Sequence, residues 1–130
     1  MPRLIKKRDG ATRPEYLPNL LRIAAAAADH KAIDLRACDV RGLTLIADAF
    51  VLCSAASEPQ MKAIYQAVRR EMKEIGVRPL HTEGEPTGGW LVLDYGDVIF
   101  HVFREEAREF YDLDGLWGDA PLVDLGLDQE

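Results

Sequence analysis

Residues 90–103 read WLVLDYGDVIFHVF, two apolar runs separated by the polar stretch D-Y-G-D. This pattern predicts two adjacent antiparallel strands joined by a turn. Side chains alternate along a strand, so Leu91 and Leu93 share one face while Trp90 and Val92 share the other. Both faces are largely apolar, whereas a sheet with one solvated face would alternate with polar residues. We therefore expect each face to be covered, either by helices of this chain or by a partner.

The segments around this hairpin predict further strands and helices. Ser57 and Gln60 form a capping box, which begins an amphipathic helix that ends at Gly76. An alanine-rich segment with helical periodicity precedes it, and the other apolar runs have the length of strands. The remaining expected elements are a helix over 17–32, strands over 35–40, 49–55 and 77–81, and a short helix over 104–117. This order predicts an α/β (α+β) fold with one sheet flanked by helices.

Length and composition predict one globular domain, because the chain has 130 residues of which 48% are hydrophobic. We expect the domain to span 15–118, between a basic disordered tail over 1–14 and a weakly ordered C-terminal tail over 119–130. No apolar run approaches the ~20 residues that cross a bilayer, and a secretory signal is absent, so a soluble cytoplasmic protein is expected. Cys38 and Cys53 lie alone in apolar surroundings, which favours buried thiols over a disulfide or metal role.

The charge is unevenly distributed along the chain. Residues 1–13 hold five basic residues and one acidic residue, whereas the rest holds 11 basic and 21 acidic residues. Affinity for nucleic acid depends mainly on Lys and Arg, so an acidic body suits a basic protein partner better than a phosphate backbone. Direct RNA contact is expected at most through the basic N-terminal tail.

Motifs that carry chemistry are weak in this sequence. Asp94 and Asp97 flank the hairpin turn and could hold a metal ion or transfer protons, but aspartate is also a common turn residue. His101 stands in the middle of an apolar strand without a second ligand at metal-binding spacing, which favours a core or interface histidine. We expect no catalytic residue, cofactor or metal site.

Aromatic residues are concentrated between residues 90 and 117, close to several acidic residues. Large aromatic anchors with a charged rim are typical of protein interfaces, although about half of these rings are expected to fill the core. These residues include Trp90, Tyr95, Phe103, Phe110, Tyr111 and Trp117.

Three blocks of the sequence resemble the ribosomal silencing factor family (RsfS, also called Iojap). They read ADAFVLCSAASEPQMKAIYQAV, EGEPTGGWLVLDYGDVIFHVF and REFYDLDGLW, and they stand in the order and spacing of that family. The resemblance implies a nucleotidyltransferase-like fold, in which helices flank a single mixed sheet. It covers the proposed domain, while the basic start lies outside the shared part.

The resemblance also implies a function. Members of this family are not enzymes; they bind the large ribosomal subunit through ribosomal protein L-fourteen and sterically block joining of the small subunit when nutrients are scarce. Carried over by position, the contact residues fall on Trp90, Asp94 and Tyr95. The neighbours expected beside them are Glu83, Gly84, His101, Phe103, Tyr111, Leu113, Leu116 and Trp117.

Two other interpretations remain open. One is a nucleotidyltransferase-like enzyme that uses Asp94 and Asp97 with a divalent cation, although the Gly-Ser signature of active transferases is absent from CSAAS. The other is a self-associating module, because an exposed apolar sheet edge favours symmetric pairing. Proteins similar to this chain often form homodimers, so a homodimer of the free protein is expected.

Overall fold

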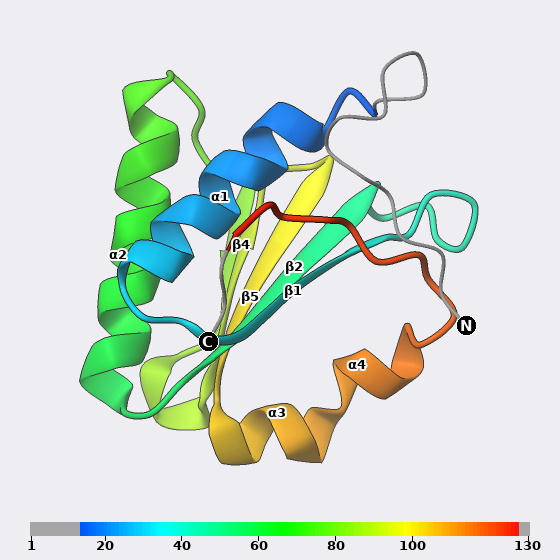
Figure 1. Ribbon diagram of the computed structural model, residues 1–130. Helices are drawn as coiled ribbons and strands as arrows, with labels where there is room; N and C mark the ends of the chain where they lie inside the picture. The colour runs from blue at the N-terminus through cyan, green and yellow to red at the C-terminus, as the bar shows by residue number, and fades with distance from the viewer. Residues whose placement is uncertain (1–13, 128–130) are drawn as a thin grey trace.

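A five-stranded mixed sheet forms the centre of the molecule (Figure 1). The computed structural model describes residues 14–127, so the tail predicted over 1–14 lies outside the described residues except for Pro14. The sheet order is β1-β2-β5-β4-β3, in which β2 and β5 are parallel and the other neighbours are antiparallel. The strands are β1 (Ile33–Asp39), β2 (Ala49–Ala55), β3 (His81–Glu83), β4 (Trp90–Asp94) and β5 (Val98–Arg104). The predicted single sheet flanked by helices is confirmed.

The hairpin predicted from residues 90–103 is formed by β4 and β5. Trp90 is opposite Phe103 and Leu91 is opposite Val102 in the antiparallel register. Gly96 takes a φ of 90°, which few other residues adopt, and its N–H donates to the Asp94 carboxylate at 2.7 Å. The turn therefore has the chemistry that the D-Y-G-D stretch predicts.

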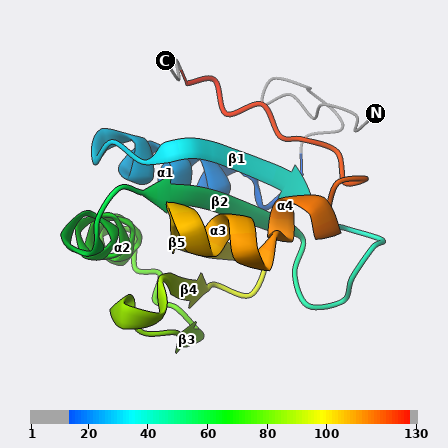
Figure 2. The same cartoon turned by 90° about the horizontal axis from the view of Figure 1, so that it is seen from below.

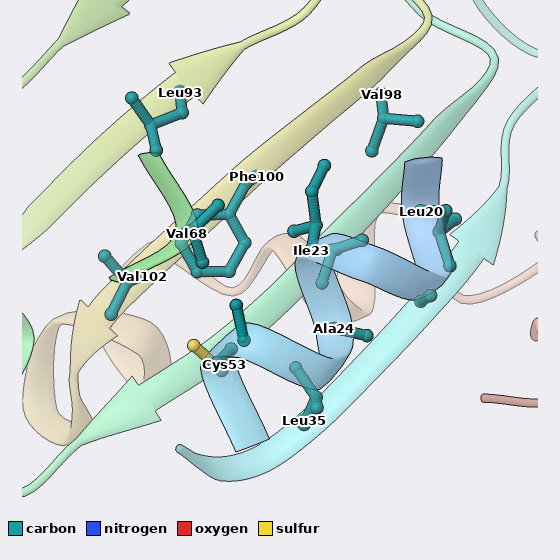
Figure 3. Packing of buried hydrophobic residues seen from close by; sticks show 14 of the residues in the cluster. Leu20, Ile23, Ala24, Leu35, Cys53, Val68, Leu93, Val98, Phe100 and Val102 are labelled. Atoms are coloured by element: carbon teal, nitrogen blue, oxygen red, sulfur yellow. The ribbon is translucent and has the colours of Figure 1, made fainter. Parts of the chain in front are cut away.

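Helices α1 (Leu17–Asp29) and α2 (Glu58–Glu74) cover the first face of the sheet. Their apolar stripes pack on the alternate residues of β4 and β5 that point to this face. Ile23 and Val68 lie close to Phe100 (Figure 3). The capping box at the start of α2 is present, because Gln60 N–H donates to Ser57 Oγ at 3.2 Å. Helices of the chain itself thus cover the Leu91 and Leu93 face.

Helices α3 (Glu105–Tyr111) and α4 (Leu113–Leu116) lie on the opposite, second face (Figure 2). The prediction of one helix over 104–117 is wrong, because Asp112 takes a left-handed conformation with a φ of 50°. This conformation ends α3, and the Asp112 carboxylate then accepts a hydrogen bond from Gly115 N–H at 3.0 Å and caps α4. The break turns α4 back over the second face.

The C-terminal segment packs along the edge of β1, contrary to the weakly ordered tail predicted over 119–130. Asp39 N–H donates to the Pro121 carbonyl at 2.8 Å, and Val123 N–H donates to the Ala37 carbonyl at 2.9 Å. Ala120 is buried on the second face, whereas Val123 and Leu125 are buried in the first-face core. The segment therefore crosses from one face to the other and closes the β1 edge.

The third strand is also displaced from its prediction. The sequence predicts a strand over 77–81, but β3 begins at His81 and pairs with β4 from His81 opposite Asp94. Gly76, with a φ of 77°, ends the preceding helix, and residues 77–80 connect the two elements. The 3-10 turn η2 (Pro86–Gly88) then leads into β4.

The two cysteines are buried on opposite faces of the sheet, as free thiols. Cys53 belongs to the first-face core and Cys38 to the second-face cluster. Burial raises the pKa of Cys38 to about 11 and that of Cys53 to about 12. The prediction of buried structural thiols is confirmed. Among residues 14–127, none of the helices has the length and apolar character to cross a bilayer.

Candidate protein interface

Trp90 lies on the second face as a partly buried aromatic ring with part of its surface open to solvent. Its indole stacks on Phe103, with centroids 5.0 Å apart, and lies 4.7 Å from the Tyr111 ring. Phe103 is fully buried beneath it, and Tyr111 is 46% exposed beside it. The indole is therefore supported from below and accessible from outside, as an interface anchor must be.

A hydrogen bond fixes the orientation of this indole. Trp90 Nε1–H donates to Nδ1 of His101 at 3.1 Å, and an indole nitrogen is only a donor. Nδ1 must therefore lack a proton, and the neutral imidazole carries its proton on Nε2. Burial lowers the pKa of His101 to about 4, so the ring is neutral near pH 7. Nε2 is buried without a hydrogen-bond partner among the described residues.

Exposed apolar side chains from α3 and α4 extend the surface around Trp90. Leu116 is 71% exposed and Phe110 is 81% exposed, while Trp117 packs edge-on against Phe50 at 5.3 Å. Phe50 in turn contacts His101, which joins the Trp117 and Trp90 sides of the surface. We define the docking face by its accessible aromatic and leucine side chains, Trp90, Tyr111, Leu113, Leu116 and Trp117.

The charge around the docking face is acidic. Residues 105–119 contain six acidic residues and a single basic one, Arg108, which is buried. Such a surface favours association with a basic protein partner.

The structure separates the predicted contact residues into three groups. Trp90, Tyr111, Leu113 and Trp117 lie together on the docking face and Leu116 is exposed on α4 next to them in sequence, whereas Phe103 and His101 lie buried beneath it. Phe103 and His101 therefore support the surface without forming it.

The other predicted contact residues lie elsewhere. Tyr95 packs in the first-face core at 8% exposure, because its side chain points to the same face of the sheet as those of Leu91 and Leu93. Glu83 is exposed on β3, and its carboxylate lies 3.0 Å from His81 Nε2. Gly84, with a φ of 91°, has a backbone role, since a Cβ there would overlap the Trp90 carbonyl oxygen.

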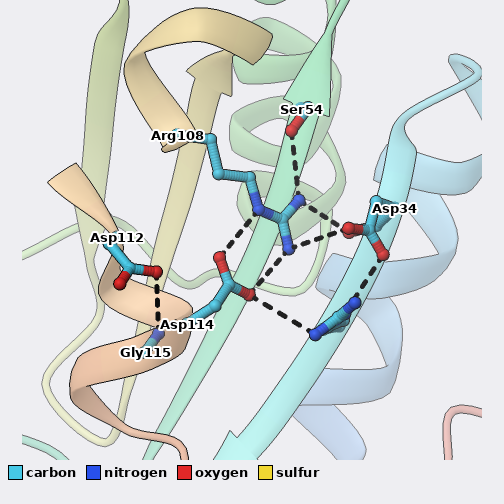
Figure 4. Close-up of polar contacts among 7 residues, drawn as sticks. Asp34, Ser54, Arg108, Asp112, Asp114 and Gly115 are labelled. Atoms are coloured by element: carbon cyan, nitrogen blue, oxygen red, sulfur yellow. Dashed lines mark hydrogen bonds and ion pairs between the residues drawn. The ribbon is translucent and has the colours of Figure 1, made fainter. Parts of the chain in front are cut away.

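Sequence reasoning missed the residue that holds α3 and α4 on the sheet. Arg108 is buried and donates to both carboxylate oxygens of Asp114, each at 3.0 Å (Figure 4). It also donates to the Asp34 carbonyl at 2.7 Å and to Ser54 Oγ at 3.1 Å. The hydrogen bonds from Arg108 hold the pKa of Asp114 below its ordinary value. The charged stretch REEAREF carries no sign that this arginine is buried.

Of the two aspartates of the enzyme interpretation, Asp94 serves the turn with its side chain, whereas Asp97 contacts the start of β2 with its main chain. The Asp94 carboxylate is engaged with Gly96 N–H, and the Asp97 carbonyl accepts from Asp48 and Ala49 N–H at 2.8 and 3.0 Å. Within residues 14–127, no group of three or more His, Cys, Asp or Glu side chains is placed to hold a metal ion. The turn-forming interpretation of Asp94 and Gly96 is confirmed.

Comparisons with known proteins agree with this architecture. A family described as "Ribosomal silencing factor during starvation", RsfS, matches residues 14–130. The ribosomal silencing factor RsfS of Bacillus subtilis is 43% identical over 108 residues, which cover 82% of this chain and 92% of that protein. The chloroplastic protein Iojap of Zea mays is 31% identical over 116 residues, 89% of this chain and 50% of that protein.

Solved structures give the same result. A crystal structure of a Chromobacterium violaceum protein is similar to this chain with a TM-score of 0.77 and 31% identity, covering 81% of this chain and 88% of that one. A Bacillus halodurans protein has a TM-score of 0.73 and 32% identity, covering 83% of this chain and 98% of its own. The family match and these similarities, which span most of the chain, show that it belongs to the ribosomal silencing factor family, RsfS.

Proposed function

We propose that this chain is a cytoplasmic translational repressor that binds the large ribosomal subunit. The docking face contacts ribosomal protein L-fourteen, and the bound chain sterically blocks joining of the small subunit when nutrients are limited. Membership of the ribosomal silencing factor family supports the ribosomal target. The accessible Trp90 indole on an acidic second face is the single observation that supports a basic protein partner.

The anchor and its neighbour make the proposal testable by substitution. Trp90→Ala removes the stacked indole, and a buried anchor of this kind contributes about 2 kcal/mol or more, which is roughly a thirtyfold loss of affinity. Leu116→Ser alters a side chain that is 71% exposed, so this second variant leaves the core intact. We expect both variants to bind purified L-fourteen more weakly, measured by isothermal titration, and to inhibit subunit joining less in light scattering.

The matched control is Leu80→Ser, because Leu80 is 78% exposed and lies outside the docking face, beside α2. Its affinity for purified L-fourteen should equal that of the wild type. Wild-type affinity in folded Trp90→Ala and Leu116→Ser proteins would show that the docking face is not the site. The homodimer remains a prediction, for which the exposed leucine and aromatic side chains of the docking face offer a surface.

A further inference from the structure

A second surface lies beside α2, away from the docking face. A solvent-open groove of about 500 Å³ runs between the C-terminal half of α2 and the segment that enters β3. Arg69 and Lys73 line it from the helix, and Arg78 and His81 line it from the facing segment. Val77 and the exposed Leu80 contribute apolar side chains to its lining. The proposed function makes no use of this groove.

The groove concentrates positive charge in an otherwise acidic protein. Its lining residues include no Asp or Glu, and the Glu83 carboxylate lies at its edge, 3.0 Å from His81 Nε2. Residues 61–81 hold five Lys or Arg and two Glu, whereas the rest of residues 14–130 holds six Lys or Arg and 19 Asp or Glu. The positive side chains of such a local excess repel one another, and together they attract an anion.

The three Arg and Lys side chains of the groove also lack the carboxylate partners that six of the other eight Lys and Arg residues in 14–127 have; Lys31 and Arg70 are likewise unpaired there. Within residues 14–127, Arg22, Arg36, Lys62, Arg104 and Arg108 each lie within 4.0 Å of a carboxylate, as does Arg41. Arg69, Lys73 and Arg78 have no such ion pair in that part of the chain. Arg69 donates to the Tyr65 hydroxyl at 3.4 Å and lies over its ring, which positions the guanidinium without neutralising it.

We propose that this groove binds the phosphodiester backbone of RNA. The inference rests on the proposed function, which brings the chain to a particle that contains RNA. Arg69 and Lys73 lie about one helical turn apart, roughly 6 Å along α2, and Arg78 lines the facing segment, so the cations can contact successive phosphates. The groove is open and its charges are spread over two segments, an arrangement suited to a strand better than to a single small anion.

The location allows both surfaces to act together. The groove adjoins α2, which covers the first face, whereas the docking face lies on the second (Figures 1 and 2). A protein contact through Trp90 therefore leaves the groove free for RNA. With only three strong cations, the RNA contact is weak by itself and adds to the affinity of the protein contact. Because the cations contact phosphates and not bases, the groove has little preference for RNA sequence.

Fluorescence anisotropy with a labelled single-stranded RNA of about 12 nucleotides tests the inference on the full chain. The groove variant carries Arg69→Gln, Lys73→Gln and Arg78→Gln, all at exposed positions, and the control carries Lys6→Gln, Lys7→Gln and Arg8→Gln. Both lose three positive charges. Losing three phosphate contacts should reduce the slope of log affinity against log salt by about 2, so between about 50 and 200 mM salt the wild type loses roughly twentyfold more affinity than the groove variant.

The outcomes separate the possible binding sites. Weakened RNA binding in the groove variant, with near wild-type binding in the tail variant, supports the inference. Loss in the tail variant alone, equal loss in both, or no binding by the wild type would overturn it. Full displacement of the RNA by inorganic phosphate at the same phosphate concentration would also overturn it, because the site would then select a small anion. The assay contains no ribosomal protein, so its result is independent of the Trp90→Ala test.

Discussion

The hydrogen bond between Trp90 and His101 couples an accessible anchor to a buried titratable ring. Protonation of His101 at Nδ1 would turn this acceptor into an N–H group that points at the Trp90 Nε1–H. It would also place a positive charge on a buried side chain. Because burial lowers the folded-state pKa to about 4, the unfolded chain takes up the proton first, near pH 6.5. This contribution to stability is present above pH 6.5 and is lost as the pH falls toward 4.

The pH dependence can be measured by urea unfolding of the wild type and His101→Gln. Between pH 7 and about pH 4.5, the His101 contribution to the free energy of unfolding should fall by about 2 kcal/mol, from the pKa difference. His101→Gln, which can still accept the Trp90 hydrogen bond, should lack that part of the decrease. His81→Gln is the control because His81 is exposed. Parallel pH profiles for the wild type and His101→Gln would contradict this account.

The sequence predicts some of these side chains better than others. Trp90 is identifiable as an anchor because a large ring stands where strand alternation gives an open face. The same alternation places Tyr95 with the core residues Leu91 and Leu93, and the structure follows the alternation there. Arg108 could not be predicted, because its partners Asp34, Ser54 and Asp114 come from three distant or separate elements.

At the scale of elements, local signals predict α2 and the β4–β5 hairpin closely. The capping box, the apolar stripe and the D-Y-G-D turn each determine structure through residues that are neighbours in sequence. The break at Asp112 and the C-terminal segment depend instead on tertiary contacts. Asp112 lies in a sequence that favours one continuous helix, and residues 120–125 gain order only by pairing with the β1 edge.

The Arg108 network holds α3 and α4 on the sheet, so its loss should affect both stability and the docking face. Asp114→Asn removes the carboxylate that accepts two hydrogen bonds from Arg108 and leaves the buried guanidinium with only the Asp34 carboxylate, 3.7 Å away. Since Asp114 is partly exposed, we expect about 2 kcal/mol of destabilisation in urea unfolding. The binding of L-fourteen should weaken as well, because α4 carries Leu116.

Asp119→Asn supplies the matched control, since it makes the same chemical change at an exposed position two residues after Trp117. It should unfold at the same urea concentration as the wild type. If Asp114→Asn were as stable as the wild type, Ser54 and the carbonyl and carboxylate of Asp34 would be sufficient partners for the guanidinium.

At the scale of the whole molecule, the two faces of the sheet have different covers. Long helices seal the first face, whereas two short helices and a chain segment leave the area around Trp90 open on the second. The apolar character of both sides of β4 therefore has two separate causes, burial within the chain on one side and the proposed docking on the other. The apolar pattern of the sequence predicts that both faces of the sheet are covered. It does not reveal the strand order, which decides which face the helices of the chain cover and which face stays open to a partner.

Because the two buried thiols lie on opposite faces of the sheet, alkylation of each one measures how often the layer that covers its face separates from the sheet. Alkylation requires an accessible thiolate, which burial suppresses at both positions, so iodoacetamide can react only when a face opens. Cys38 lies beneath α4 and the C-terminal segment, while Cys53 lies under the long helices. Mass spectrometry of the native protein should therefore detect modification of Cys38 before Cys53, and simultaneous modification would mean that both layers separate in a single event.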